Sequence, residues 1–148
     1  MTHETLHVAP ELRAIAQPLL ASFTGTHFET LGLVFTRLDK MSVVAMMPVG
    51  PRVHQPMGLL HGGASVALAE SVASIGAWLN VFEQGLTAVG QEINANHVRG
   101  VRSGIVTATA VPAYLGRSSH VWTVELRDER ERLVCLSRCT LAIVTAPQ

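Results

Sequence analysis

The stretch "GLLHGGASVALAESVASIGAWLN" (residues 58–80) is the most apolar part of this 148-residue chain. Residues 64–80 have helical spacing, and their apolar side chains are not confined to one stripe, which indicates a helix covered on nearly all sides. Glu70 is the one charged residue between Arg52 and Glu83. Burial of an unpaired carboxylate is unfavourable by several kcal/mol, so this acid is either paired or kept for its reactivity.

After Gly85 the sequence changes to short β-rich segments separated by turn signals. In the segment 119–128, Trp122, Val124 and Leu126 alternate with more polar residues, which is the period of a half-buried strand. About six strands around one long helix, without alternating β-α-β units, predict an α+β fold in which a curved antiparallel sheet wraps around the helix. We expect four strands at residues 87–99, 104–115, 119–128 and 132–145, and a hairpin of residues 31–38 and 42–49 around Asp39 to Met41.

The length predicts one domain spanning residues 1–148, with residues 1–30 as an N-terminal helical extension. Residues 10–23 have helical spacing, but we expect Pro18 to break or restart that helix. The first residues lack the basic and then apolar pattern of a signal peptide, and no window approaches the ~18 to 20 apolar residues of a membrane span. We therefore expect a cytoplasmic protein.

Charge is scarce and balanced. The net charge is zero and the pI is near 7.1, so there is no basic field to hold nucleic acid or an anionic membrane. Charged residues make up 15% of the chain, against a typical ~25%. This low content favours a surface covered by a second copy of the chain, and a compact monomer is the alternative.

The two cysteines, Cys135 and Cys139, fall on one face of an expected strand. No other cysteine or histidine stands at metal-ligand spacing beside them. We expect buried free thiols and no metal.

Two features of the apolar stretch indicate chemistry. His61, Gly62 and Gly63 stand at the start of the expected helix, where free backbone N–H groups and the helix dipole favour an anionic oxygen. Glu70 follows roughly 10 to 12 Å along the axis, so a substrate laid along the helix would meet the donors of one subunit and the carboxylate of another. Ser74 lies one turn further and can hydrogen-bond to Glu70.

Each of these features also has a structural alternative. Glu70 can reach solvent or a partner's cation, the glycines can serve tight packing, and His61 can be a helix cap.

Three segments carry a family resemblance: "HQPMGLLHGGASVALAES" (54–71), "AVGQEINANHVRG" (88–100) and "AYLGRSSHVWTVELRDERERLVCLSRCTLAIV" (113–144). They resemble the hotdog-fold acyl-CoA thioesterases of the phenylacetate-degradation superfamily. The greatest likeness is to the branch of 4-hydroxybenzoyl-CoA, 1,4-dihydroxy-2-naphthoyl-CoA and enterobactin-pathway proofreading thioesterases. The resemblance covers about residues 30 to 145 and implies a hotdog fold.

The resemblance also implies roles for individual residues. Glu70 matches the nucleophile or general base, and the Gly62 N–H matches the group that polarises the thioester carbonyl. His61 matches a residue that helps to position the carbonyl, Gln55 an amide beside the thioester, and Ser74 a hydroxyl that orients water or the carboxylate.

A coenzyme A groove is implied by the same likeness. Arg99 and Arg117 suit the nucleotide phosphates, because guanidinium groups bind phosphate well, although both can be exposed strand-end charges. Tyr114 stands where relatives often carry histidine. The residues implied for the groove are Gly90, His97, Val98, Arg99, Gly100, Tyr114, Leu115, Gly116, Arg117, Ser118 and Ser119.

The expected activity is hydrolysis of acyl-CoA thioesters with aromatic or medium-chain acyl groups, without a metal or bound cofactor. The resemblance implies a homodimer that completes each site from two chains, paired again into a homotetramer, and acyl carrier protein is a possible alternative carrier of the substrate. We expect the acyl pocket to use Met57, Val66, Ala73, Ala77, Trp78 and Phe82.

Three rival functions stay open. The first is a non-hydrolytic module that binds acyl-CoA or an acyl carrier protein, against which Glu70 and Ser74 count. The second is a hotdog hydratase or dehydratase, which resembles its relatives through Asp and His at the start of the helix, whereas Asp39 and Asp128 lie in expected hairpin turns. The third is a purely structural role.

Overall fold

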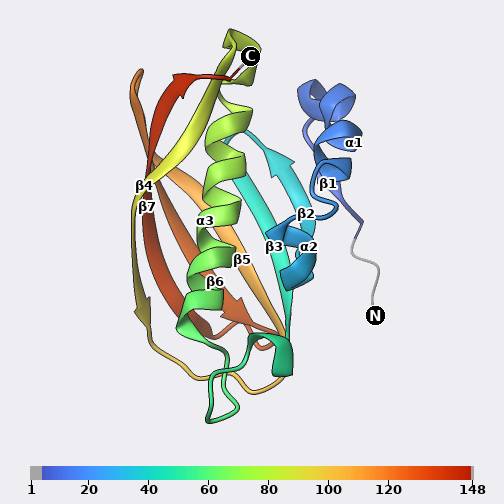
Figure 1. The fold of residues 1–148 in the computed structure, drawn as a ribbon, viewed down its shortest axis with the longest axis vertical. Coiled ribbons are helices and arrows are strands. Elements are labelled where there is room, and N and C mark those ends of the chain that lie inside the picture. Colours follow the sequence, from blue (N-terminus) through green and yellow to red (C-terminus); the bar gives the residue numbers. More distant parts are fainter. Residues whose placement is uncertain (1–4, 148) are drawn as a thin grey trace.

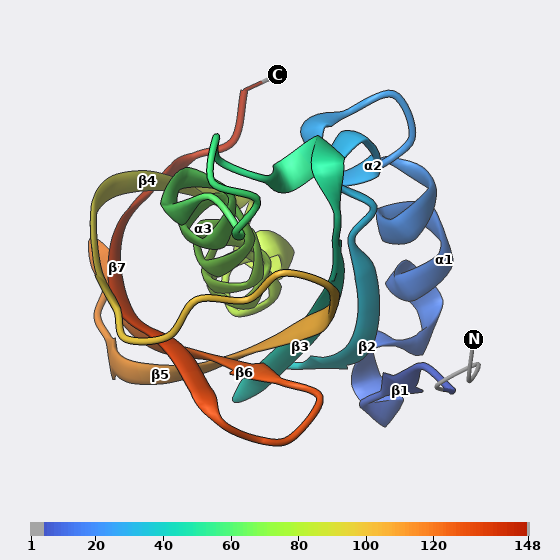
Figure 2. The ribbon, with the colours of Figure 1, turned by 90° about the horizontal axis from the view of Figure 1, so that it is seen from below.

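A curved sheet holds one long helix. The structure, a computed structural model, describes residues 5–147. Its seven strands stand in the order β1-β2-β3-β5-β6-β7-β4, and all neighbours are antiparallel except β1 and β2. The sheet curves around α3 (Figures 1 and 2), which confirms the predicted α+β architecture. The strands are β1 (His7–Val8), β2 (Val34–Asp39), β3 (Ser42–Val49), β4 (Leu86–His97), β5 (Gly104–Leu115), β6 (Ser119–Asp128) and β7 (Leu133–Thr145).

The central helix, α3 (Gly62–Leu79), has no exposed residue after Gly63. The indole of Trp122 on β6 packs against it at Gly76, where a Cβ atom would lie 2.6 Å from the ring. Any side chain at this position would push the helix away from the sheet, so the glycine fixes how closely α3 approaches β6. The alternation predicted for β6 is confirmed, because Trp122, Val124 and Leu126 are fully buried.

The N-terminal region differs from the expected helix over residues 10–23. A 3-10 turn (Pro10–Leu12) leads into α1 (Arg13–Ala21), and Pro18 lies inside α1 without breaking it. The carbonyl that loses its partner belongs to Ala14, which is exposed, so water can hydrate it. The strand β1 is a seventh strand that the pattern did not predict.

A short second helix, α2 (His27–Leu31), connects α1 to the sheet. The hydroxyl oxygen of Thr26 accepts a hydrogen bond from the Phe28 N–H and caps this helix. The ring of Phe23 lies 4.7 Å from that of Phe28 and 5.0 Å from that of Phe35 on β2, measured between centroids. This aromatic cluster attaches the N-terminal helices to the sheet beside α3.

Both cysteines are buried and free, as predicted. Burial raises the pKa of the Cys139 thiol to about 12, and the nearby carboxylates of Glu70 and Glu92 add to the effect. Within residues 5–147 no helix combines the length and apolarity needed to cross a bilayer.

Candidate active site

The start of α3 presents one free backbone donor. The Nδ1 atom of His61 accepts a hydrogen bond from the Gly63 N–H at 2.8 Å, so His61 caps the helix. The Gly62 N–H points out of the helix and has no acceptor among residues 5–147, as expected for the first turn. The helix start therefore offers the Gly62 N–H to a ligand, and His61 orders the turn that presents it.

A cavity of about 370 Å³ opens at this donor, lined by Gln55, Leu59, Leu60, Gly62, Ser65, His97, Val98, Arg99, Gly100 and Val134. The imidazole of His97 lies against Gly62, and its Nε2 is 3.0 Å from where a Cβ at position 62 would stand. Glycine at 62 thus lets His97 approach the free N–H. The cavity joins Gln55 and Gly62 to the first part of the implied coenzyme A groove.

Gln55 is held by a tight turn. Its backbone N–H donates to the Leu59 carbonyl at 2.8 Å, and its own carbonyl accepts from the Gly58 N–H at 2.9 Å. The side-chain oxygen accepts a hydrogen bond from the Met57 N–H. The amide NH2 remains as a donor on the side chain of a residue that lines the cavity.

Glu70 lies half-buried on α3 and lines a different cavity, of about 270 Å³. No cation pairs with its carboxylate among residues 5–147. The Ser71 hydroxyl donates to the Ala67 carbonyl, whereas the Ser74 hydroxyl has no partner in the described chain. Ser74 is thus available to a water or to the carboxylate, although no hydrogen bond joins it to Glu70 here. The cavity is lined by His27, Phe28, Ala67, Glu70, Ser71 and Ser74.

The Glu70 carboxylate packs against the backbone of β4. A Cβ at Gly90 would overlap with Oε1 of Glu70, so the glycine makes room for the acid. The pairing of β4 with β7 shifts register between Gly90 and Glu92, which leaves Gln91 as an extra residue. Such a bulge bends a strand and re-aims its side chains. Gly90, which the resemblance places in the coenzyme A groove, borders the carboxylate.

The donor and the acid are separate within one chain. Gly62 and Glu70 stand eight residues apart on α3, which is about 12 Å along the axis and about 80° around it. They open into different cavities.

The residues implied for coenzyme A also fall into two groups. Residues 97–100 border the helix-start cavity, while residues 114–119 surround the turn between β5 and β6. The turn lies at the far end of β5, whose 12 residues span roughly 40 Å. Arg99 and Arg117 of one chain thus belong to opposite ends of β5.

The expected acyl pocket is corrected in part. Ala73 and Ala77 are fully buried against the sheet and line neither cavity. Trp78 lines an apolar cavity between α3 and the N-terminal helices, and its ring stacks on that of Phe82. His27 and Phe28 line the Glu70 cavity as well. The sequence did not single them out, because nothing in the local pattern indicates that α2 packs there.

Comparison with known proteins gives consistent matches. Residues 57–135 match the family model described as Thioesterase superfamily. The chain is 46% identical to a 1,4-dihydroxy-2-naphthoyl-CoA hydrolase of Listeria monocytogenes, over 78% of this chain and 93% of the relative. It is 45% identical to a proofreading thioesterase of Cronobacter sakazakii, over 86% and 93%. A crystal structure of a thioesterase from Haemophilus influenzae superposes with a TM-score of 0.84 at 42% identity, covering 89% of this chain and 92% of that one.

Proposed function

Because this chain belongs to the thioesterase superfamily, we propose that it hydrolyses acyl-CoA thioesters of aromatic or medium-chain acids to the free acid and coenzyme A. The observation that carries the proposal is the pair of unsatisfied groups on α3. One is the free Gly62 N–H, beside Gln55 and His97, and the other is the Glu70 carboxylate, which has no cation partner in residues 5–147.

Gly62 supplies the electrophilic side of the reaction. The thioester carbonyl oxygen accepts a hydrogen bond from its N–H, and negative charge that develops on this oxygen is stabilised by about 3 to 4 kcal/mol per donor. The free NH2 of Gln55 is a second donor of the same cavity. The helix dipole acts in the same direction.

Glu70 supplies the nucleophilic side. As a general base it takes a proton from water while the water oxygen bonds to the carbonyl carbon, and as a nucleophile its own oxygen forms that bond. The C–S bond then breaks, and coenzyme A leaves as a thiolate that takes up a proton. In the nucleophilic route this leaves an anhydride between the acyl group and Glu70, which water hydrolyses to the free acid and the regenerated carboxylate. Ser74, in the same cavity, orients the water or the carboxylate.

Two chains complete each site in this proposal. Strand β4 forms an edge of the sheet described for residues 5–147, where it pairs with β7 alone, and Val89 on it is 51% exposed. Two-fold pairing along this edge runs two α3 helices antiparallel, so that Gly62 of one chain approaches Glu70 of the other. A homodimer is then the minimal active unit, with a homotetramer as its further assembly.

The test is steady-state hydrolysis of benzoyl-CoA, followed with a thiol reagent. Glu70→Gln should lower kcat by about 10²- to 10⁴-fold, because it removes the base and keeps the shape. Glu83→Gln, the same change at an exposed site that pairs with Lys40, is the matched control and should retain wild-type turnover. Near-normal turnover by Glu70→Gln would contradict the assignment. Saturable binding without thiol release by the wild type would favour a non-hydrolytic module, and hydrolysis of an acyl carrier protein thioester alone would change the carrier.

A further inference from the structure

The turn that carries Gln55 has little packing to hold its tip. The Gly58 N–H donates to the Gln55 carbonyl at 2.9 Å, which closes a β-turn over residues 55–58 with Pro56 at the position that favours proline. Met57, the next residue, is 72% exposed, so its side chain adds little burial to the turn. The place of the turn relative to the helix-start cavity therefore depends largely on polar contacts.

Arg102 supplies such a contact between the turn and the rest of the chain. Its Nη1 donates to the Met57 carbonyl at 3.2 Å and also lies 3.6 Å from where a Cβ at Gly58 would stand. Among residues 5–147 no other hydrogen bond joins residues 55–59 to another segment. A hydrogen bond from a charged guanidinium is stronger than one between neutral groups, and the rigid fork of arginine fixes its direction.

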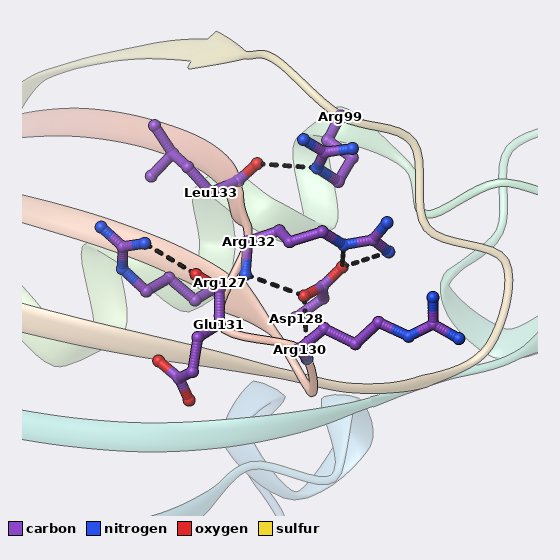
Figure 3. A network of polar contacts seen from close by, with 7 residues as sticks. All are labelled: Arg99, Arg127, Asp128, Arg130, Glu131, Arg132 and Leu133. Atoms are coloured by element: carbon purple, nitrogen blue, oxygen red, sulfur yellow. Dashed lines mark hydrogen bonds and ion pairs between the residues drawn. The ribbon is translucent and has the colours of Figure 1, made fainter.

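The backbone that carries Arg102 is itself held in place. The Arg102 carbonyl lies 2.8 Å from Nε2 of His54, and because a carbonyl only accepts, that nitrogen carries the hydrogen. Figure 3 shows the start of the same segment, where Nε of Arg99 donates to the carbonyl of Leu133 on β7 at 3.3 Å. The guanidinium of Arg102 is thus attached to a segment that is bonded both to the loop before α3 and to the sheet.

From Arg102 the contacts lead to the amide of Gln55. Arg102 holds the carbonyl of Met57, and the N–H of the same Met57 donates to the side-chain oxygen of Gln55. Because that oxygen accepts this bond, the NH2 is the end of the amide left for the cavity that Gln55 and Gly62 line. Loss of the Arg102 bond frees the Met57 carbonyl, and with it the direction of the NH2.

We propose that Arg102 is a positioning residue, which acts through the turn of residues 55–58 to direct the Gln55 amide at the thioester. The inference rests on the proposed function, in which this amide is a second donor to the carbonyl oxygen. A displacement of about 1 Å can lower a rate by as much as about 10²-fold, even when the substituted residue is remote from the chemistry. Arg102 therefore contributes to kcat without touching the substrate.

A direct contact with the substrate is the competing interpretation. Arg102 also lines a cavity of about 330 Å³ with Arg130 and Arg132, and guanidinium groups bind phosphate well. The two roles predict different kinetics. Loss of a phosphate contact raises KM and affects only substrates that carry phosphates, whereas loss of a positioning residue lowers kcat for any thioester.

The test compares benzoyl-CoA with benzoyl-pantetheine, which lacks the nucleotide and its phosphates, as substrates of the full-length protein. Arg102→Ala should lower kcat about tenfold for both, with KM changed by less than about twofold. Arg102→Lys keeps a charged donor for this single bond and should retain about half or more of the wild-type kcat. Adding Arg102→Ala to Gln55→Ala should lower kcat no further, because Arg102 acts through Gln55.

Arg52→Ala is the matched control. Arg52 is exposed, like Arg102, and its Nη1 also donates to a backbone carbonyl, that of Thr30 at 3.1 Å. The control should leave kcat and KM unchanged. An equal loss of kcat in Arg52→Ala, or additive losses when Arg102→Ala is combined with Gln55→Ala, would overturn the positioning role. A rise in KM confined to benzoyl-CoA would replace it with a phosphate contact.

A measurement without substrate separates this inference from the activity. The backbone N–H order parameters of Met57 and Gly58, from NMR relaxation, should be about 0.85 in the wild type and fall below about 0.6 in Arg102→Ala. Arg102→Lys and Arg52→Ala should keep the wild-type values. This result supports the role of Arg102 in holding the turn even if no thioester is hydrolysed, and unchanged order parameters in Arg102→Ala oppose it.

Discussion

The start and the middle of α3 differ in what surrounds them. At the start, residues of the loop before α3 and residues 97–100 surround a free N–H with polar groups, and a histidine cap fixes the turn. In the middle, one carboxylate fits into the space left by a glycine on a bulged edge strand, beside two serines and the second N-terminal helix. One region holds a free backbone donor and the other holds an unpaired acid, so in the proposed dimer each chain would carry one half of two reactive centres.

The largest expected effect tests whether the halves belong to different chains. Glu70→Ala and Gln55→Ala should each lower kcat by about 10² or more, because one loses the base and the other a donor. After the two inactive variants are mixed and allowed to exchange subunits, half of the dimers are hybrids with one intact site. Turnover of benzoyl-CoA should then return to roughly a quarter of the wild-type value.

Failure of the mixture to regain turnover, with exchange verified by mass spectrometry of the intact dimer, would place Gln55 and Glu70 of one chain in one site. Mixing either variant with itself is the control, and should restore nothing.

A smaller effect sharpens the contrast between two glycines. Gly90→Ala should lower kcat about 10- to 100-fold, because the new methyl group displaces a carboxylate that must be placed within a fraction of an ångström. The KM for benzoyl-CoA should change little, since the helix-start cavity is untouched. Thermal unfolding and hydrolysis of benzoyl-CoA are the two measurements.

Gly76→Ala is the matched variant, with its added methyl directed at the Trp122 indole and not at the acid. It should lower the free energy of unfolding by about 1 to 3 kcal/mol, as overpacked cores do. A loss of kcat in both variants with equal loss of stability would mean that Gly90 acts through the fold alone.

The smallest expected effect, on thermal stability, concerns the turn of residues 128–132 between β6 and β7, which Asp128 organises. The Arg132 guanidinium and backbone N–H groups lower the pKa of Asp128 from 3.8 to about 2. Since the folded-state pKa lies below that of the unfolded chain, this carboxylate stabilises the fold above about pH 4, and the stabilisation is lost as the pH falls toward 2. Asp128→Asn should therefore lower Tm modestly at neutral pH, and its difference from wild type should shrink across that window. A Tm difference that is constant from neutral pH to pH 2 would contradict this account.

Local pattern was enough for the scaffold. The bounds expected for β5 and β6 agree with the structure, because alternation and flanking turns are properties of neighbouring residues. The single charge at Glu70 and the glycines at the start of α3 were also recognisable from their neighbouring residues. The helix with Pro18 inside it was mispredicted, since an exposed carbonyl tolerates the lost bond and exposure is a tertiary property.

Long-range contacts were beyond the sequence. Nothing near Gly90 shows that Glu70, on another element, fills the space that its missing side chain leaves. Arg130 and Arg132 belong to a charged run that, in the sequence, indicates only a hairpin turn. The cavity that they share with Arg102 depends on the pairing of β5 with β6. The chemistry of Arg99 and Arg117 suits phosphate, but only the fold shows that they belong to opposite ends of β5.

The buried thiols make the chain a convenient reporter of its own reaction. With burial holding the pKa of Cys139 near 12 and also raising that of Cys135, fewer than about one in 10⁴ Cys139 side chains is a thiolate at neutral pH. Electrophilic thiol reagents that detect released coenzyme A should therefore not react with the protein's own cysteines. The absorbance of a sample without substrate should stay constant. The same shielding predicts that mild oxidants leave both sulfur atoms reduced.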